Sequence, residues 1–218
     1  MLVVAVATAS IFFIACNSRA DTSVVLPKST LALWHLVPDA DSVSVTVGDT
    51  RITNRIYGQK RADTTFDGGL IPIVVRVNND TIFNGNTMVV PGTAYTLVIG
   101  DSIPRARFFL YQRRTIDTAG NLAGLRFLHA SPLVSTTQVT WRDSINAFTN
   151  KTYLDFFATP NLFFSSNYLA TGAGELAIKP PTSVQAIDSI PATLLAGKNY
   201  TLLLLNQQQA PKLVLLPD

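Results

Sequence analysis

The stretch SVSVTV at positions 42–47 alternates valine with serine and threonine. Val43, Val45 and Val47 fall on one side of an extended chain and the hydroxyl residues fall on the other, which is typical of a half-buried β-strand. The same alternation recurs at 73–77, 95–99 and 200–204, with Asn, Gly and Pro turn signals between the runs. No run of ten residues has a helical period, so the sequence predicts an all-β protein.

The strand that ends in VTVGDT at 45–50 is repeated 94 residues later as VTWRDS at 139–144, and His35 and His129 share that offset. A second match, VVPGTAYTLVIGD at 89–101 with LLAGKNYTLLLLN at 194–206, has an offset of 105. The second copy therefore carries about eleven extra residues between Asp143 and Gly197. Short strands in two copies predict two tandem antiparallel β-sandwich domains of the immunoglobulin-like type.

Composition changes along the chain predict its division into segments. We expect a signal peptide at 1–16, a polar tether at 17–29, a first β-sandwich at 30–116, a linker at 117–124 and a second β-sandwich at 125–218.

The first sixteen residues are apolar and small, and they end at Cys16, the only cysteine of the chain. A membrane span needs about 20 residues, so this segment is typical of the apolar part of an export signal. Its end, FIAC, resembles the lipobox of bacterial lipoproteins, which implies a lipid on Cys16. An ordinary signal peptide with an incidental cysteine is the alternative. We predict a location in the cell envelope, as an outer membrane lipoprotein held to the membrane through its N-terminal lipid, with secretion as the alternative.

The charge of the chain gives little reason to expect nucleic-acid binding. The net charge is +3, and the 17 basic residues stand singly or in pairs. The densest group is Arg105, Arg107, Arg113 and Arg114, which flank an apolar stretch and are expected to be the solvated ends of a strand.

The residue types that perform catalysis or bind metals are few. His35 and His129 each follow apolar residues on one strand face, so we expect both on the core side of the first strand of their copy. Glu175 is the only glutamate, and the nearest carboxylate pair is Asp39 and Asp41 in a turn. We therefore predict no catalytic residues, no metal site and no cofactor, and we predict that the protein is not an enzyme.

The extra residues of the second copy are rich in aromatic side chains. Seven of the chain's twenty aromatic residues lie between positions 148 and 168: Phe148, Tyr153, Phe156, Phe157, Phe163, Phe164 and Tyr168. Exposed rings would stack on sugars or bind a protein partner, whereas buried rings would fill the second core or cover the junction between the domains.

A short motif, Asp followed by Ser or Thr and then an apolar residue or Thr, recurs along the chain. Its hydroxyl residues are Ser42, Thr64, Thr81, Ser102, Thr118, Ser144 and Ser189. The motif resembles an O-glycosylation signal used on exported bacterial proteins, and these seven residues are the predicted sites. Turn chemistry alone also favours such triplets, so both interpretations stay open.

The second copy contains AGLRFLHASP at 123–132, then a Val-Thr strand, and AGKNYTLLLL at 196–205. This combination resembles the bacterial domain-of-unknown-function family 4397, whose members are often exported, are often lipoproteins and often carry the module in tandem. The resemblance implies a fold and a location without any catalytic residues. We predict a non-catalytic, lipid-anchored envelope protein with a binding or structural role and an envelope protein or glycan as its partner. A carbohydrate-binding accessory lipoprotein of a surface uptake system is the alternative.

Overall fold

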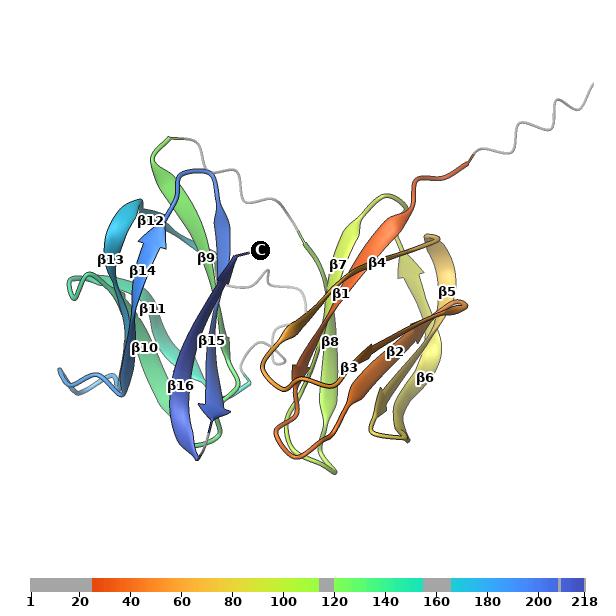
Figure 1. Cartoon of the computed structure of the whole chain (residues 1–218), viewed down its shortest axis with the longest axis horizontal. Helices are drawn as coiled ribbons and strands as arrows, with labels where there is room; N and C mark the ends of the chain where they lie inside the picture. The colour runs from red at the N-terminus through yellow and green to blue at the C-terminus, as the bar shows by residue number, and fades with distance from the viewer. Residues whose placement is uncertain (1–24, 114–119, 155–165, 208, 218) are drawn as a thin grey trace, which may run out of the picture.

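The computed structural model describes residues 25–113, 120–154, 166–207 and 209–217, and these residues form strands and turns. Four sheets of four strands each make two β-sandwiches, which confirms the predicted fold class. Figure 1 shows the two sandwiches side by side. None of the described residues belongs to a helix long and apolar enough to cross a membrane.

The first sandwich contains eight strands in two sheets, ordered β4-β1-β7-β8 and β3-β2-β5-β6. The bounds are β1 Ser29–Leu36, β2 Val43–Val47, β3 Thr50–Asn54, β4 Lys60–Phe66, β5 Gly69–Val77, β6 Asp80–Val89, β7 Ala94–Gly100 and β8 Arg107–Gln112.

The second sandwich repeats this arrangement strand for strand, ordered β12-β9-β15-β16 and β11-β10-β13-β14. The bounds are β9 Leu122–His129, β10 Thr136–Trp141, β11 Ile145–Thr152, β12 Ser166–Ala170, β13 Gly172–Lys179, β14 Asp188–Leu194, β15 Asn199–Gln207 and β16 Ala210–Pro217. β9 therefore begins inside the segment 117–124 that was expected to be a linker.

The prediction of antiparallel sheets needs one correction, because each sandwich contains a parallel pair at its centre. β1 pairs with β7 in parallel, and β9 pairs with β15 in parallel. The alternation of side chains in a strand is the same for both directions, so it does not distinguish parallel from antiparallel pairing. In immunoglobulin domains the second and third strands lie in different sheets. Here β2 and β3 are neighbours in one sheet, so the architecture is shared while the strand order differs.

The registers of these parallel pairs confirm the internal repeat. Leu31 pairs with Tyr95 in the first sandwich, and Leu125 pairs with Tyr200 in the second. Leu125 is 94 residues after Leu31 and Tyr200 is 105 residues after Tyr95, which are the two offsets of the sequence.

The extra residues enter the second copy at two places. The connection from β3 to β4 is 55–59, whereas that from β11 to β12 is 153–165. The turn from β5 to β6 is 78–79, whereas that from β13 to β14 is 180–187. Both insertions lie in connections, where added length leaves the pairing of the strands intact.

Each sandwich has its own core between its two sheets. Val43, Val45 and Val47 are all buried in the first core, as their alternation predicts. The second core uses the larger Trp141 at the place of Val47, beside Gly174. A Cβ atom on Gly174 would lie 2.6 Å from the indole ring, so the glycine provides the space that the tryptophan occupies.

A third apolar cluster joins the two sandwiches. Its buried members are Trp34, Leu36, Val98, Leu128, Ala130, Leu154, Leu203 and Leu205. Figure 1 shows the sheet that contains β1, β7 and β8 facing the sheet that contains β9, β15 and β16. Trp34 and Leu128 are equivalent residues of the two copies, and so are Val98 and Leu203, so both copies contribute the same face to this interface.

Gly58 offers a test of this interface. Its φ is +74°, and an added Cβ atom would lie 2.6 Å from the Cδ1 atom of Leu205 in the other sandwich. Gly58→Ala is expected to lower the free energy of unfolding by about 2 to 3 kcal/mol, because the left-handed backbone and the contact with Leu205 both oppose a methyl group.

The matched control is Gly48→Ala, because Gly48 has a φ of +55° and nothing within 4 Å of its added Cβ atom. This control is expected to cost about 1 kcal/mol, from backbone strain alone. Urea unfolding of both variants measures the difference, and equal losses would contradict the packing of Gly58 against Leu205.

Candidate functional site

An open groove of about 840 Å³ lies along the edge strands β3 and β4 of the first sandwich. Its lining residues are predominantly polar, and four of them are cationic: Arg51, Arg55, Lys60 and Arg61. No aspartate or glutamate is among the lining residues, so the groove presents positive charge to solvent.

The side chain of Asn54 holds the connection between β3 and β4, which carries part of this groove. Its Nδ2 atom donates hydrogen bonds to the carbonyl oxygens of Leu33 at 3.1 Å and Gln59 at 2.7 Å, and its Oδ1 atom accepts one from the N–H of Ile56 at 3.1 Å. Because Asn54 is buried and uses both ends of its amide, the turn has a fixed shape. The backbone positions of Arg55 and Lys60 beside this turn are thereby defined.

The backbone of β1 holds the same turn from the other side. The N–H of Gly58 donates to the carbonyl of His35 at 2.8 Å, and the N–H of His35 donates to the carbonyl of Gln59 at 3.3 Å. The left-handed φ of Gly58 allows the chain to reverse at this point. The groove is therefore built against β1, which is buried along nearly its whole length.

The four cations of the groove are not neutralised within the described part of the chain, where their side chains make no ion pair or hydrogen bond. The arginine group that looks densest in the sequence differs in this respect. Arg107 pairs with Asp101 at 3.2 Å and Arg113 pairs with Asp63 at 2.6 Å. Arg105 is exposed, and Arg114 lies outside the described residues.

The second sandwich does not repeat this cationic edge. Arg51 pairs with Thr46, and Asn146 occupies the equivalent position beside Thr140. Between positions 145 and 154 the second copy has Lys151 as its one basic residue, whereas the first copy has four between positions 51 and 61.

The aromatic residues predicted as a binding surface lie in different environments. Phe148 is buried in the second core and Tyr153 packs in the interface between the sandwiches. Tyr168, on β12, has 49% of its surface exposed. Phe156, Phe157, Phe163 and Phe164 lie outside the described residues. The structure therefore does not bring the three described rings together.

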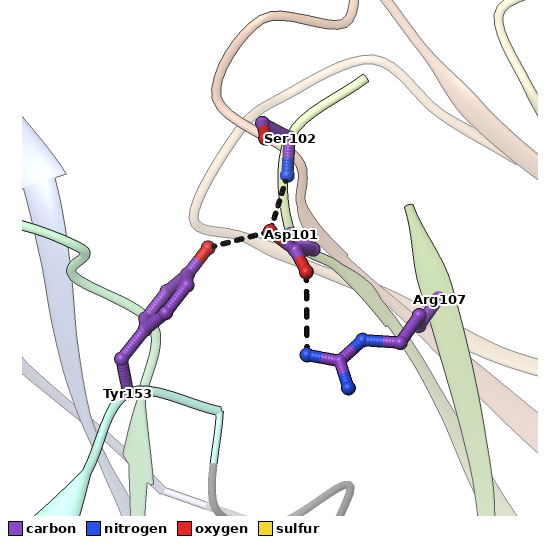
Figure 2. A network of polar contacts seen from close by, with 4 residues as sticks. All are labelled: Asp101, Ser102, Arg107 and Tyr153. Carbon is purple, nitrogen blue, oxygen red and sulfur yellow. Dashed lines mark hydrogen bonds and ion pairs between the residues drawn. The ribbon is translucent and has the colours of Figure 1, made fainter. Parts of the chain in front are cut away.

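Figure 2 shows the polar contacts of Tyr153 across the interface. Its hydroxyl donates a hydrogen bond to Oδ1 of Asp101 at 3.3 Å, and the same carboxylate accepts bonds from the N–H of Ser102 at 2.9 Å and from Arg107. Burial and the negative charge of Asp101 both raise the pKa of Tyr153. Its phenol therefore stays protonated and serves as a structural donor.

The equivalent tyrosine of the first sandwich makes the reciprocal contact. The hydroxyl of Tyr57 accepts a hydrogen bond from the N–H of Asn206 at 3.3 Å. Asn206 is the counterpart of Asp101 in the second copy, 105 residues further along the chain. Burial raises the pKa of Tyr57. Tyr57 and Tyr153 each also contact a histidine of their own sandwich edge-on, at 6.1 Å from His35 and 6.3 Å from His129.

Both histidines are fully buried at the ends of β1 and β9, as predicted from their position in the pattern. The Nδ1 atom of His35 accepts the N–H of Val37, which leaves its proton on Nε2 to be donated to the carbonyl of Ala40 at 3.1 Å. Nδ1 of His129 likewise accepts the N–H of Ser131. These rings close the turns after the first strands. Among the described residues, no three of His, Cys, Asp and Glu gather as a metal site.

The predicted glycosylation sites differ in exposure. Thr81 and Ser144 are exposed, and Ser42, Thr64, Ser102 and Ser189 are half-buried. Thr118 and the predicted lipidation site Cys16 lie outside the described residues.

Comparison with protein-family models finds none that matches this chain, and comparison with curated proteins finds no significant match. The resemblance to family 4397 therefore stays a prediction.

Sequence reasoning missed the cationic groove. Its signal was present as four basic residues within eleven positions, with no acidic residue among them. The pattern was hidden because the group at 105–114 has a similar density, and the ion pairs that neutralise Arg107 and Arg113 join residues 6 and 50 positions apart.

The burial of His129 predicts a pH-dependent stability. Burial lowers its pKa to about 4, against 6.5 in the unfolded chain. Between these values the unfolded state binds a proton that the folded state does not, so stability falls as the pH decreases from about 6.5 to about 4. Its contribution to this loss is expected to be about 2 to 3 kcal/mol.

Urea unfolding at about pH 7.5 and about pH 4.5, compared between the natural chain and His129→Gln, measures this contribution. The variant should lose less stability on acidification, although the lowered pKa of buried His35 adds a smaller effect in both proteins. NMR titration of the ring protons gives an independent check, and a His129 pKa near 6.5 would contradict the prediction.

Proposed function

We propose that the chain is an exported, lipid-anchored cell-envelope protein with a non-catalytic binding role, and that the groove of the first sandwich is its binding site. The observation that carries this proposal is the polar groove with four unneutralised cations on a turn fixed by Asn54. Binding sites are usually concave and largely pre-formed, and their polar groups fix the orientation of the ligand.

The chemistry of the groove supports binding rather than catalysis. A catalytic site needs a nucleophile beside a base, or converging acids and bases. The lining of the groove has arginine, lysine, amide and hydroxyl groups and contains neither histidine nor a carboxylate. His35 lies behind the turn, with both ring nitrogens in hydrogen bonds to the backbone.

The location rests on the apolar segment that ends at Cys16. In a lipoprotein the lipid on Cys16 would be followed by a polar segment of eight residues before the first described residue, Val25. Eight or nine extended residues span at most about 30 Å, so the first sandwich would stay close to the membrane. The segment from Cys16 enters at Ser29, the first residue of β1, whereas the groove residues Lys60 and Arg61 pair with the last part of that strand. An outer membrane lipoprotein would therefore carry the groove at the end of the sandwich that is distant from its anchor.

The alternative function, a carbohydrate-binding accessory lipoprotein, was predicted to use aromatic residues between Phe148 and Tyr168. Of the three that the structure describes, two are packed in interiors and Tyr168 is exposed. Stacking on sugar rings needs exposed faces, so the described rings give this form of the hypothesis little support.

Mass spectrometry of the protein from its native membrane fraction tests the anchor. Trypsin cleaves after Arg19, so a lipoprotein yields the short N-terminal peptide CNSR from 16–19 with the mass of a diacylglyceryl group on Cys16. Cys16→Ala is the control and should move the protein out of the membrane fraction. An unmodified N-terminus at another residue, with the protein in the soluble fraction, would contradict the anchor.

The same sample tests the glycosylation motif. If sugars are attached to folded protein, the exposed Thr81 and Ser144 should carry glycan at higher occupancy than the half-buried Thr64 and Ser189, because a modifying enzyme must reach the hydroxyl. Occupancy is read from the masses of the corresponding peptides. Bare hydroxyls at Thr81 and Ser144 would leave turn formation as the explanation of the motif.

A further inference from the structure

We propose that the ligand of the groove is an acidic glycan, an extended chain of sugar units that carries carboxylate, phosphate or sulfate groups. This inference rests on the proposed binding role of the groove, and it does not depend on the lipid anchor. It follows from three properties of the lining: its charge, its unused hydrogen-bonding groups and its lack of aromatic rings.

The charge of the groove calls for a ligand with several negative groups. Arg51, Arg55 and Arg61 are exposed and Lys60 is half-buried, and none of them has an acidic partner among the described residues. Guanidinium groups bind carboxylate, phosphate and sulfate through paired hydrogen bonds. Four cations along one groove therefore fit a polyanion better than a single small anion, whose charge one or two of them would satisfy.

The neutral groups of the groove fit the hydroxyl groups of a sugar. Ser42, Thr53, Gln59 and Asn79 line it, and in the described structure their side chains form no hydrogen bonds with other residues. Hydroxyl and amide groups both donate and accept hydrogen bonds, as sugar hydroxyls do. Because these groups line the same groove as the cations, the groove can bind both the charged and the neutral groups of an acidic sugar chain.

The lining contains no aromatic rings, which favours an acidic glycan over a single-stranded nucleic acid or a neutral sugar as the ligand. Single-stranded nucleic acids bind through basic grooves in which bases stack on aromatic side chains, and neutral sugars also bind by stacking. The apolar lining residues of this groove are Ile56 and Ala62, and no Phe, Tyr, Trp or His is among the lining residues. Recognition must therefore come from charge and hydrogen bonds.

Protection of the sheet edges does not account for this concentration of charge. Charged side chains on edge strands prevent unwanted strand pairing, and β3 and β4 are edge strands. β11 is the equivalent edge strand of the second sandwich, and it has Asn146 at the place of Arg51 and one basic residue, Lys151. The same module thus maintains that edge without a cationic cluster, so the four cations of the first sandwich need another explanation.

Calorimetric titration of the full chain in detergent tests the proposal with defined probes. The probes are an oligogalacturonate, which carries carboxylates, a low-mass dextran sulfate, and neutral dextran. The groove variant is Arg51→Gln with Arg55→Gln, and the control variant is Arg105→Gln with Lys198→Gln. Both variants remove two exposed positive charges, and Arg105 and Lys198 are not lining residues.

At least one acidic probe should bind the natural chain, and neutral dextran should not. The groove variant should bind the acidic probe about tenfold more weakly or worse, because two charge-assisted contacts are lost, while the control variant should change binding by about twofold or less. Raising the salt concentration should weaken binding less steeply in the groove variant than in the control. Comparison of the two acidic probes identifies the preferred anionic group.

Three results would overturn the proposal: equal loss in the two variants, which would reduce the effect to net charge; equal binding of neutral dextran; and no binding of either acidic probe. Tighter binding of a single-stranded DNA of the same charge would assign the groove to nucleic acid instead. The titration is repeated with Cys16→Ala, so that failure of the lipid anchor and failure of the glycan assignment are separate results. Unchanged thermal unfolding of both double variants shows that the fold is intact.

Discussion

The structure depends on the burial of one strand in each copy from both sides. One face of β1 contributes Leu31 and Leu33 to the core of its sandwich, and the other face contributes Trp34 and Leu36 to the interface with the second sandwich. β9 is buried in the same way. A strand buried on both faces leaves little access to solvent, so the fully buried His35 is hydrogen-bonded to the backbone through both ring nitrogens, and burial lowers its pKa. The same strand provides the carbonyl and N–H groups that hold the turn of the groove.

The interface that results resembles that of a symmetric dimer, although one chain makes both halves. Equivalent residues meet reciprocally: Tyr57 contacts Asn206, and Tyr153 contacts Asp101, which is the counterpart of Asn206. The symmetry is broken in the packing. Leu205 fills the space beside Gly58, whereas the counterpart of Gly58 is Leu154, which is itself buried in the interface with a φ of +57°. In one half of the interface the leucine belongs to β15, as Leu205, and in the other half it belongs to the turn, as Leu154. This difference is possible because the copies are no longer identical in sequence.

Local sequence patterns were sufficient for the strands, the two copies and the burial of the histidines. The alternation in 42–47 gives the buried valines directly, since side-chain direction in a strand follows from position alone. The parallel pairing of β1 with β7 and the cationic groove could not be obtained in this way. Both depend on which distant segments become neighbours. Arg113 is neutralised by Asp63, which is 50 residues away, and no local pattern distinguishes that arginine from Arg51.

The two copies have diverged strongly in the connection that follows the third strand of the module. In the first copy it is short, is held by Asn54 and Gly58, and stands among four basic residues. In the second copy the connection of 153–165 replaces 55–59, and its sequence is aromatic rather than basic. Elsewhere the copies agree strand for strand, because the buried faces of β1 and β9 tolerate little change. A connection at the edge of a sandwich is free of that constraint, so it is where a duplicated module can acquire a separate binding specificity in each copy.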